Sequence, residues 1–90
     1  MKIPKKLKIG GHIYKIVLEK GNNKLEVRNY GKTARDKNEI ILDSSLPENQ
    51  LIVTLFHEIL HAINSQLNET MVDSLGEQLY QVFKDNKLLK

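Results

Sequence analysis

The stretch His57-Glu58-Ile59-Leu60-His61 has the pattern H-E-x-x-H and lies in an apolar-periodic run that predicts a helix. Residues four apart lie one above the other on a helix, so His57 and His61 present two imidazoles to a single point. They can supply two ligands of a tetrahedral zinc ion. The Glu58 carboxylate lies beside that point without being a ligand, where it can take a proton from zinc-bound water. The alternative is an ordinary helix with two histidines four apart by coincidence, which the helical context makes rare.

The composition limits what can surround this motif. Ninety residues are enough for one small domain and too few for two, so we expect a single domain over residues 1–90. The chain has no cysteine, which excludes disulfides and cysteine-ligated zinc and leaves only nitrogen and oxygen ligands. The hydrophobic core of so small a domain provides only marginal stability, so a metal that joins two helices would stabilise the fold as well.

Charge and hydropathy give expectations about partners and location. The formal net charge is +3, and lysines gather near both ends of the chain. They are Lys2, Lys5, Lys6 and Lys8 at one end and Lys84, Lys87 and Lys90 at the other. Such charges are usually solvated, so we do not expect nucleic-acid binding, without excluding it. No stretch reads as a signal peptide or a membrane span, so we expect a soluble intracellular protein without a membrane partner. The pattern indicates no oligomeric state.

The first half of the chain, residues 1–44, predicts a small sheet. Two short β-branched runs between residues 6 and 20 are separated by Gly10-Gly11 and predict two strands, with His12 at a surface position. Residues 25–30 predict the returning strand of a hairpin, and residues 31–38 predict a loop or bulged turn. Glu39–Asp43 predicts a further strand. We therefore expect an α+β fold with a small antiparallel or mixed sheet of about three strands, followed by an antiparallel two-helix hairpin.

The first helix of that hairpin is predicted over residues 46–65. Ser45 and Glu48 have the spacing of a capping box, and Pro47 is tolerated in a first helical turn. Thr54 is predicted to share a stripe with the two histidines and Glu58. The neighbouring stripe is predicted to face the core and comprises Leu51, Ile52, Leu55, Ile59, Ala62 and Ile63.

The second helix is predicted from Glu69 to about Asp85, with Asn68 as its N-cap. Its predicted buried face comprises Val72, Leu75, Leu79, Val82 and Phe83. The helical segment 45–85 thus forms a hairpin whose second helix passes back alongside the histidines.

A catalytic zinc site needs a third protein ligand, and the second helix offers Glu69, Asp73 and Glu77. Folding the hairpin about its loop places Asp73 opposite the middle of the motif, with the other two acids one turn to either side. Geometry alone favours Asp73 slightly. Each acid can also be explained as a solvated charge, and Glu69 as one favoured by the helix dipole.

The segment Asn68-Glu69-Thr70-Met71-Val72-Asp73-Ser74-Leu75-Gly76 resembles the glutamate-bearing helix of thermolysin-type gluzincins, N-E-x-x-x-D-x-F-G. The resemblance implies that Glu69 binds zinc and that Asp73 supports a ligating histidine from outside the ligand set. Asp73 is the alternative third ligand if the first helix continues past residue 65.

The chain from about Gly31 onward also resembles the small H-E-x-x-H metallopeptidase-like proteins of bacteriophages and prophages and, more distantly, the ImmA/IrrE group. The likeness rests on the strands followed by TLFHEILHAI and VDSLGEQLYQVFKDN. It implies a minimal zincin fold, a Zn²⁺ cofactor and the cytoplasm of a bacterial host.

The expected function is zinc-dependent hydrolysis of a peptide or protein, with Glu58 as general base. The Glu39–Asp43 strand could pair an extended peptide if it lies at the sheet edge. Tyr30 or Tyr80 could donate a hydrogen bond to the oxyanion. The alternative is a non-catalytic, zinc-stabilised adaptor module of phage origin. A third possibility is a nucleic-acid-associated protease that resembles the SprT-like group.

Overall fold

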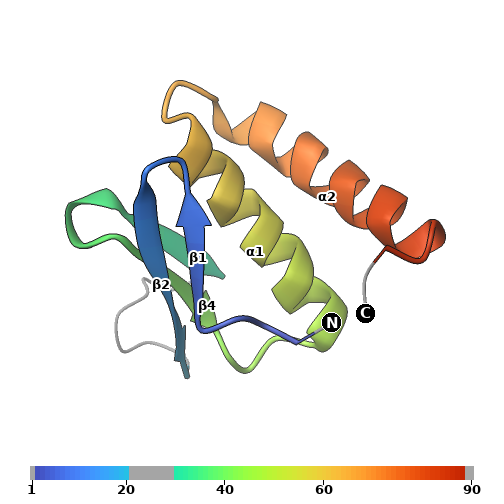
Figure 1. The fold of residues 1–90 in the computed structure, drawn as a ribbon. Helices are drawn as coiled ribbons and strands as arrows, with labels where there is room; N and C mark the ends of the chain where they lie inside the picture. Colours follow the sequence, from blue (N-terminus) through green and yellow to red (C-terminus); the bar gives the residue numbers. More distant parts are fainter. Residues whose placement is uncertain (1, 21–29, 89–90) are drawn as a thin grey trace.

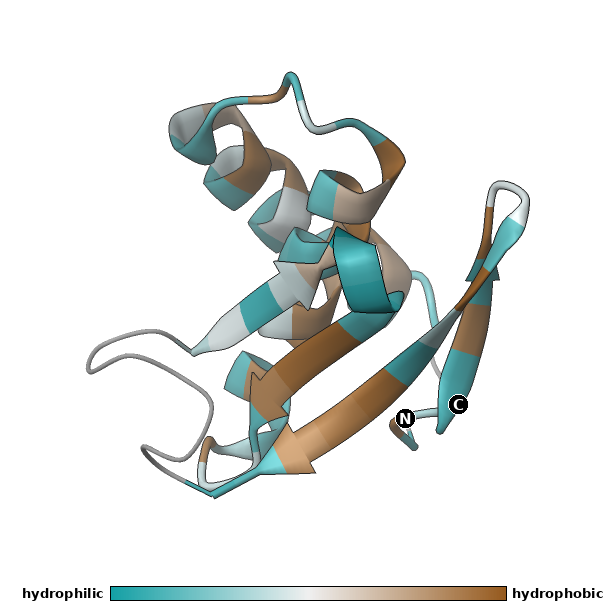
Figure 2. Cartoon of the chain, turned by 90° about the vertical axis from the view of Figure 1, so that its left-hand side faces the viewer, coloured by the Kyte–Doolittle hydropathy of each residue, from teal (hydrophilic) through white to brown (hydrophobic). Residues whose placement is uncertain are grey.

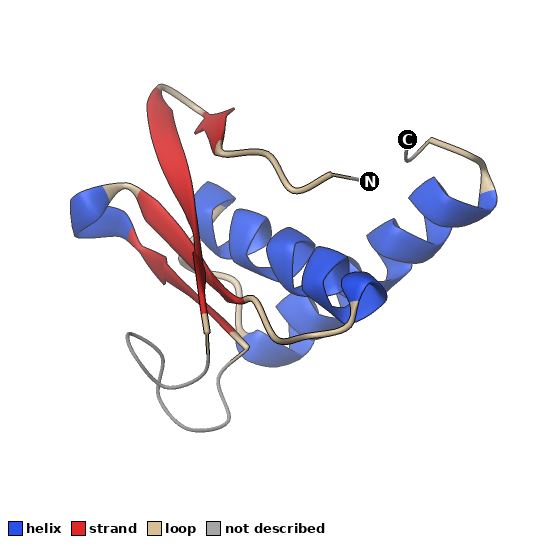
Figure 3. Cartoon of the chain, turned by 90° about the horizontal axis from the view of Figure 1, so that it is seen from below, coloured by secondary structure: helices blue, strands red, loops and turns tan. Residues whose placement is uncertain are grey.

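A mixed sheet packs on one side of helix α1, and helix α2 lies along the other side (Figures 1 and 3). The computed structural model describes residues 2–20 and 30–88. In these ranges the elements are β1 (Lys6–Ile9), β2 (His12–Glu19), β3 (Gly31–Ala34), a 3-10 helix (Arg35–Lys37), β4 (Glu39–Asp43), α1 (Glu48–Ile63) and α2 (Glu69–Asp85). The predicted α+β class is confirmed, with four strands rather than about three. Neither of these helices is long and apolar enough to cross a membrane.

The four described strands have the order β1-β2-β4-β3. β1 and β2 form an antiparallel hairpin at Gly10, whose φ of 62° suits a residue without a side chain. β4 pairs with β2 in parallel and with β3 in antiparallel orientation, so Glu39–Asp43 is an inner strand of the described sheet and does not meet the condition for pairing a peptide.

The predicted strand at residues 25–30 lies outside the described residues except for Tyr30, which is in a bend. The predicted loop over residues 31–38 is also wrong, because it contains β3 and the 3-10 helix. The sequence of β3, Gly-Lys-Thr-Ala, has little strand propensity, and its pairing with the buried strand β4 is what holds it.

The core forms where the sheet meets α1. Alternate residues of β2 and β4 point at the helix, and their apolar segments lie side by side in Figure 2. The buried cluster comprises Tyr14, Ile16, Ile40, Leu42, Leu55 and Ala62. Most of the predicted apolar stripe of α1 packs here, but Ile63, the last residue of the helix, is exposed.

The predicted capping box of α1 is wrong. The Ser45 hydroxyl donates to Asp43 Oδ1 at 2.6 Å, so it does not cap the helix. α1 begins at Glu48 after Pro47, without a side-chain cap. At α2 the prediction is confirmed, because Asn68 Oδ1 accepts a hydrogen bond from the Met71 amide at 2.8 Å.

Most of the predicted buried face of α2 is exposed. Val72 is fully buried and Phe83 is half-buried, with its ring edge-on to Phe56 at a centroid distance of 5.5 Å. Leu75, Leu79 and Val82 are about 40 % exposed, at 41 %, 37 % and 42 %. The physical reason is that α2 packs along α1 rather than on the sheet, so only a narrow arc of its surface is covered.

Candidate metal centre

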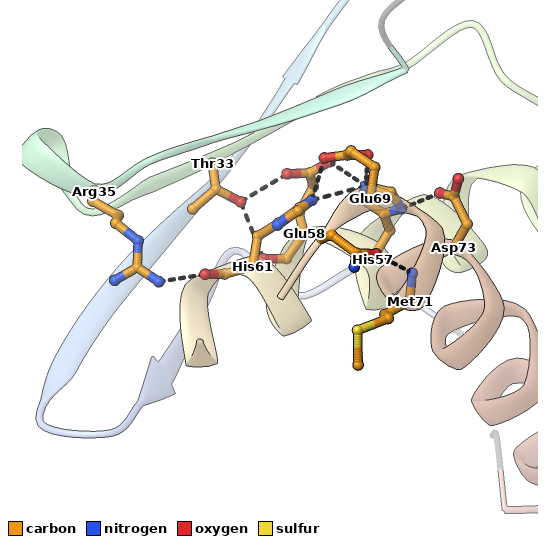
Figure 4. Close-up of polar contacts among 9 residues, drawn as sticks. Thr33, Arg35, His57, Glu58, His61, Glu69, Met71 and Asp73 are labelled. Atoms are coloured by element: carbon orange, nitrogen blue, oxygen red, sulfur yellow. Dashed lines mark hydrogen bonds and ion pairs between the residues drawn. The ribbon is translucent and has the colours of Figure 1, made fainter. Parts of the chain in front are cut away.

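Helix α1 supplies the two histidines of the candidate centre. His57 and His61 lie on one face of this helix, and their Nε2 atoms are 3.1 Å apart (Figure 4). Both side chains are about one-fifth exposed, which leaves their rings at the surface of a cavity rather than in the core. The two imidazoles therefore point at one place, as their spacing predicts.

Glu69, the first residue of α2, completes the group. Its Oε2 lies 3.2 Å from His57 Nε2, and its Oε1 lies 2.8 Å from His61 Nε2. It reaches them because α1 ends at Ile63 and Asn64 is extended, so the chain turns back at once. Among the described residues, these three side chains form the group of His, Asp and Glu able to hold a metal ion.

The spacing of these donor atoms fits a small tetrahedral ion. Metal–ligand bonds of 2.0–2.1 Å give a tetrahedron whose edges are about 3.3 Å. The two Nε2 atoms are 3.1 Å apart, and each lies close to one oxygen of Glu69, at 3.2 Å to Oε2 for His57 and 2.8 Å to Oε1 for His61. With one ligand atom taken from each residue, the three atoms lie within 4.8 Å of one another. Two imidazoles and one carboxylate are also the donors that such ions take in proteins. The residues present therefore fit a divalent metal.

Asp73 lies one turn farther along α2 and contacts the outer nitrogen of His57. Its Oδ1 is 2.9 Å from His57 Nδ1. Because a carboxylate only accepts, this contact holds the proton on Nδ1 and leaves the lone pair of Nε2 facing the centre. Glu77 lines the same cavity but does not join the group. The structure thus places the three candidate acids in three different positions.

Glu58 is the buried acid of the centre. The residue is 5 % exposed, and its Oε1 accepts a hydrogen bond from the Thr33 hydroxyl at 2.7 Å. Its Oε2 lies 3.8 Å from His57 Nε2, so one carboxylate oxygen is held and the other faces the centre. Burial raises the pKa of the Glu58 carboxyl, while the Thr33 hydrogen bond and the two histidines oppose the rise.

Strand β3 packs closely over this acid. A Cβ at Gly31 would lie 2.7 Å from Thr54 Cγ2 and 3.1 Å from Glu58 Cγ. The first contact is too short and the second is tight, so any larger residue would force the Thr54 side chain or the strand to shift. Thr33, two residues on, also lies 3.0 Å from the Glu58 carbonyl oxygen. Close backbone approach and one hydroxyl therefore set the position of Glu58.

Arg35 holds the C-terminal end of α1. Its guanidinium donates to the carbonyl oxygen of His61 (Figure 4) and, at 3.0 Å, to that of Ala62. Carbonyl groups in the last turn of a helix lack helical partners, and a cation is favoured there. Arg35 thereby stabilises the turn that carries the second histidine.

The centre lies in a cavity of about 740 Å³ between β3, α1 and the first half of α2. Tyr30 lines it, and its side chain is exposed. Tyr80 does not line the cavity, and the Lys84 ammonium lies 5.7 Å from its ring. His12 is exposed at the start of β2 and is also absent from the lining. Of the two tyrosines considered from the sequence, only Tyr30 can meet a bound molecule.

Sequence reasoning missed Gly31, Thr33 and Arg35, because each acts on α1 across more than twenty residues. Recognising a strand at residues 31–34 would have placed Gly31 and Thr33 on one face. Comparison of the chain with protein-family models, curated proteins and solved structures found no match.

Proposed function

We propose that this chain is a zinc-dependent peptidase with a gluzincin-like ligand set. The observation that carries the proposal is the arrangement of Glu58, whose free carboxylate oxygen faces a group of two imidazoles and one carboxylate. His57, His61 and Glu69 would hold the ion, and Asp73 would orient His57. This donor set favours zinc among the common divalent metals. A bound zinc ion supplies a Lewis acid that acidifies a water molecule and polarises a carbonyl.

The chain's own residues would handle the proton. Glu58 accepts a proton from the attacking water at Oε2 and returns it to the leaving amine. Thr33 keeps Oε1 occupied, so Oε2 is the oxygen available for this transfer. Burial favours the transfer, because a carboxylate with a raised pKa is a stronger base.

An extended peptide would bind along β3. This strand lies at the edge of the described sheet and runs beside Glu58, and its outer backbone groups face away from β4. Strand addition at such an edge uses main-chain hydrogen bonds, which suits a peptide of any sequence. Strand β3 thus takes the role that the sequence suggested for β4, and Tyr30 could donate a hydrogen bond to the oxyanion.

The test is cleavage of a peptide library by the zinc-loaded protein, with Glu58→Gln as the variant and Glu77→Gln as its matched control. Zinc content is measured in each protein by elemental analysis. We expect both variants to keep one zinc and only Glu58→Gln to lose cleavage by at least about a hundredfold. Equal cleavage by wild type and Glu58→Gln would overturn the proposed mechanism.

A second candidate function is a non-catalytic binding module stabilised by zinc. The exposure of Leu75, Leu79 and Val82 favours it, because a helix with so little buried area would gain stability from a metal shared with α1. This function predicts that a chelator unfolds the domain while no peptide of the library is ever cut. A zinc-loaded protein that cuts peptides would exclude it.

A further inference from the structure

Four lysines from three parts of the chain gather around one hollow of the surface, here named the lysine face. They are Lys5 just before β1, Lys6 at the start of β1, Lys15 in β2 and Lys37 in the 3-10 helix. Together with Ile13, Ile16 and Asn38 they line a hollow of about 610 Å³. None of these residues lines the cavity of the metal centre. The two sites are therefore separate.

Backbone pairing holds this lysine face in place. Lys6 lies directly opposite Lys15 in the β1–β2 hairpin. The Lys15 amide donates to the Asn38 carbonyl at 2.9 Å, which brings the 3-10 helix alongside. The Ile16 amide donates to the Lys5 carbonyl at 2.8 Å. The positions of the lysines thus follow from the sheet and not from side-chain contacts.

The arrangement concentrates positive charge. Like charges directly opposite each other on neighbouring strands are destabilising, and Lys6 and Lys15 form such a pair. Glu39 of β4 is the acid whose register position adjoins Lys15. Within residues 2–20 and 30–88, no ion pair neutralises any of the four ammonium groups. A bound anion would relieve this repulsion.

We infer that the lysine face binds the phosphate backbone of double-stranded nucleic acid. A duplex carries one negative charge about every 1.7 Å along its axis, so it offers a partner to each of the four ammonium groups whatever its base sequence.

The other residues of the lysine face favour a duplex over other anionic partners. The lining of the hollow contains no aromatic ring, and the neighbouring Tyr14 is buried in the core on the opposite face. Single-stranded nucleic acid is usually held by stacking on aromatic rings. A membrane surface is usually held by several inserted apolar side chains, and here Ile13 is the one exposed apolar residue of the lining.

The test measures binding of a fluorescent duplex of mixed sequence. Fluorescence anisotropy gives the binding constant K at salt concentrations between about 20 and 200 mM. Four phosphate contacts predict that log K falls with log salt with a slope of about −3.6. The variant Lys6→Gln/Lys15→Gln should halve this slope to about −1.8 and weaken binding at low salt. Circular dichroism verifies that the variant is folded. This inference does not depend on the peptidase function.

The control is Lys84→Gln/Lys87→Gln, which removes the same charge from the end of α2. Its affinity and slope should equal those of the wild type. Three results would overturn the inference: no duplex binding at the lowest salt, equal weakening by both double variants, or stronger binding to a single strand or to anionic phospholipid vesicles than to the duplex.

Discussion

Helices α1 and α2 both contribute to the metal centre, but they are held very differently. α1 lies between the sheet and α2 and buries five of its residues, among them Leu55 and Glu58. α2 has about the same length, yet its buried residues are Val72 and Gly76. The histidines and the proposed base therefore stand on a firmly packed helix, while Glu69 and Asp73 come from a lightly packed one.

This difference indicates which part of the centre a bound metal would stabilise. The geometry of His57 and His61 follows from one helix, which the core and Arg35 hold in place. The position of Glu69 depends on how α2 lies along α1, and Val72, Phe83 and the Asp73 contact with His57 hold it there. A bound ion would join the two helices and so stabilise the weaker of the two attachments.

The largest difference is expected from truncating apolar residues. Leu55→Ala removes a fully buried side chain from α1 and should lower the free energy of unfolding by about 2–5 kcal/mol. Leu79→Ala in α2 makes the same change at a 37 % exposed position and should cost about 1 kcal/mol or less. Urea denaturation of the metal-free proteins measures both. Equal losses would show that α2 is packed as firmly as α1.

The next effect concerns the two acids of α2 outside the ligand group. Asp73→Ala removes the partner of His57 Nδ1 and should weaken zinc binding by about 10–100-fold. Glu77→Ala, one turn on and without a contact to either histidine, should leave the affinity unchanged. Competition with a zinc-binding dye gives both affinities. If the Glu77 variant loses more than the Asp73 variant, the proposed support of His57 is wrong.

The helix starts provide a smaller contrast. Asn68→Ala removes the N-cap of α2 and should cost about 1 kcal/mol of stability. Ser45→Ala removes an exposed bond to Asp43 that does not cap α1, so it should cost about 0.5 kcal/mol or less. Thermal unfolding of the metal-free variants compares them. A larger loss of stability for Ser45→Ala than for Asn68→Ala would show that Ser45 does cap α1, as its spacing from Glu48 suggested.

The smallest effect is expected at Glu58, the buried acid of α1. Burial raises its pKa, while the Thr33 hydrogen bond and the two histidines lower it. Burial raises the pKa of Glu58 in the folded protein above its ordinary value of 4.5, so the folded state holds its proton more tightly than the unfolded state does. Relative to Glu58→Gln, metal-free wild type should therefore be most stable below about pH 4.5 and lose stability as pH rises through the folded pKa.

Denaturation of wild type and Glu58→Gln across pH in the presence of a chelator measures this difference. The exposed acid Glu77 serves as control, and Glu77→Gln is measured in the same way. A wild type that gains stability over Glu58→Gln as pH rises would contradict the raised pKa.

Local patterns predicted the elements whose signals are complete within a few residues. The hairpin at Gly10, the strand Glu39–Asp43 and the bounds of α2 with its Asn68 cap agree with the structure. The convergence of His57 and His61 also follows from helical spacing alone. In each case the deciding interaction spans at most one hairpin or one helical turn.

Other features depend on contacts between distant segments. β3 forms because β4 pairs with it, although its own residues have little strand propensity. Ser45 has the spacing of a capping box, but the Asp43 carboxylate takes its hydroxyl. The apolar pattern of α2 predicts a buried face, and only the packing against α1 decides how much of it is covered.

The sequence by itself determined the two histidines, the acid between them and the helix that presents them, because spacing along one helix is a local property. Tertiary structure decided the remaining parts of the centre. It placed Glu69 rather than Asp73 or Glu77 against both Nε2 atoms, since α1 ends early enough for the chain to turn back. It also placed Thr33 on Glu58, because strand order cannot be deduced from spacing.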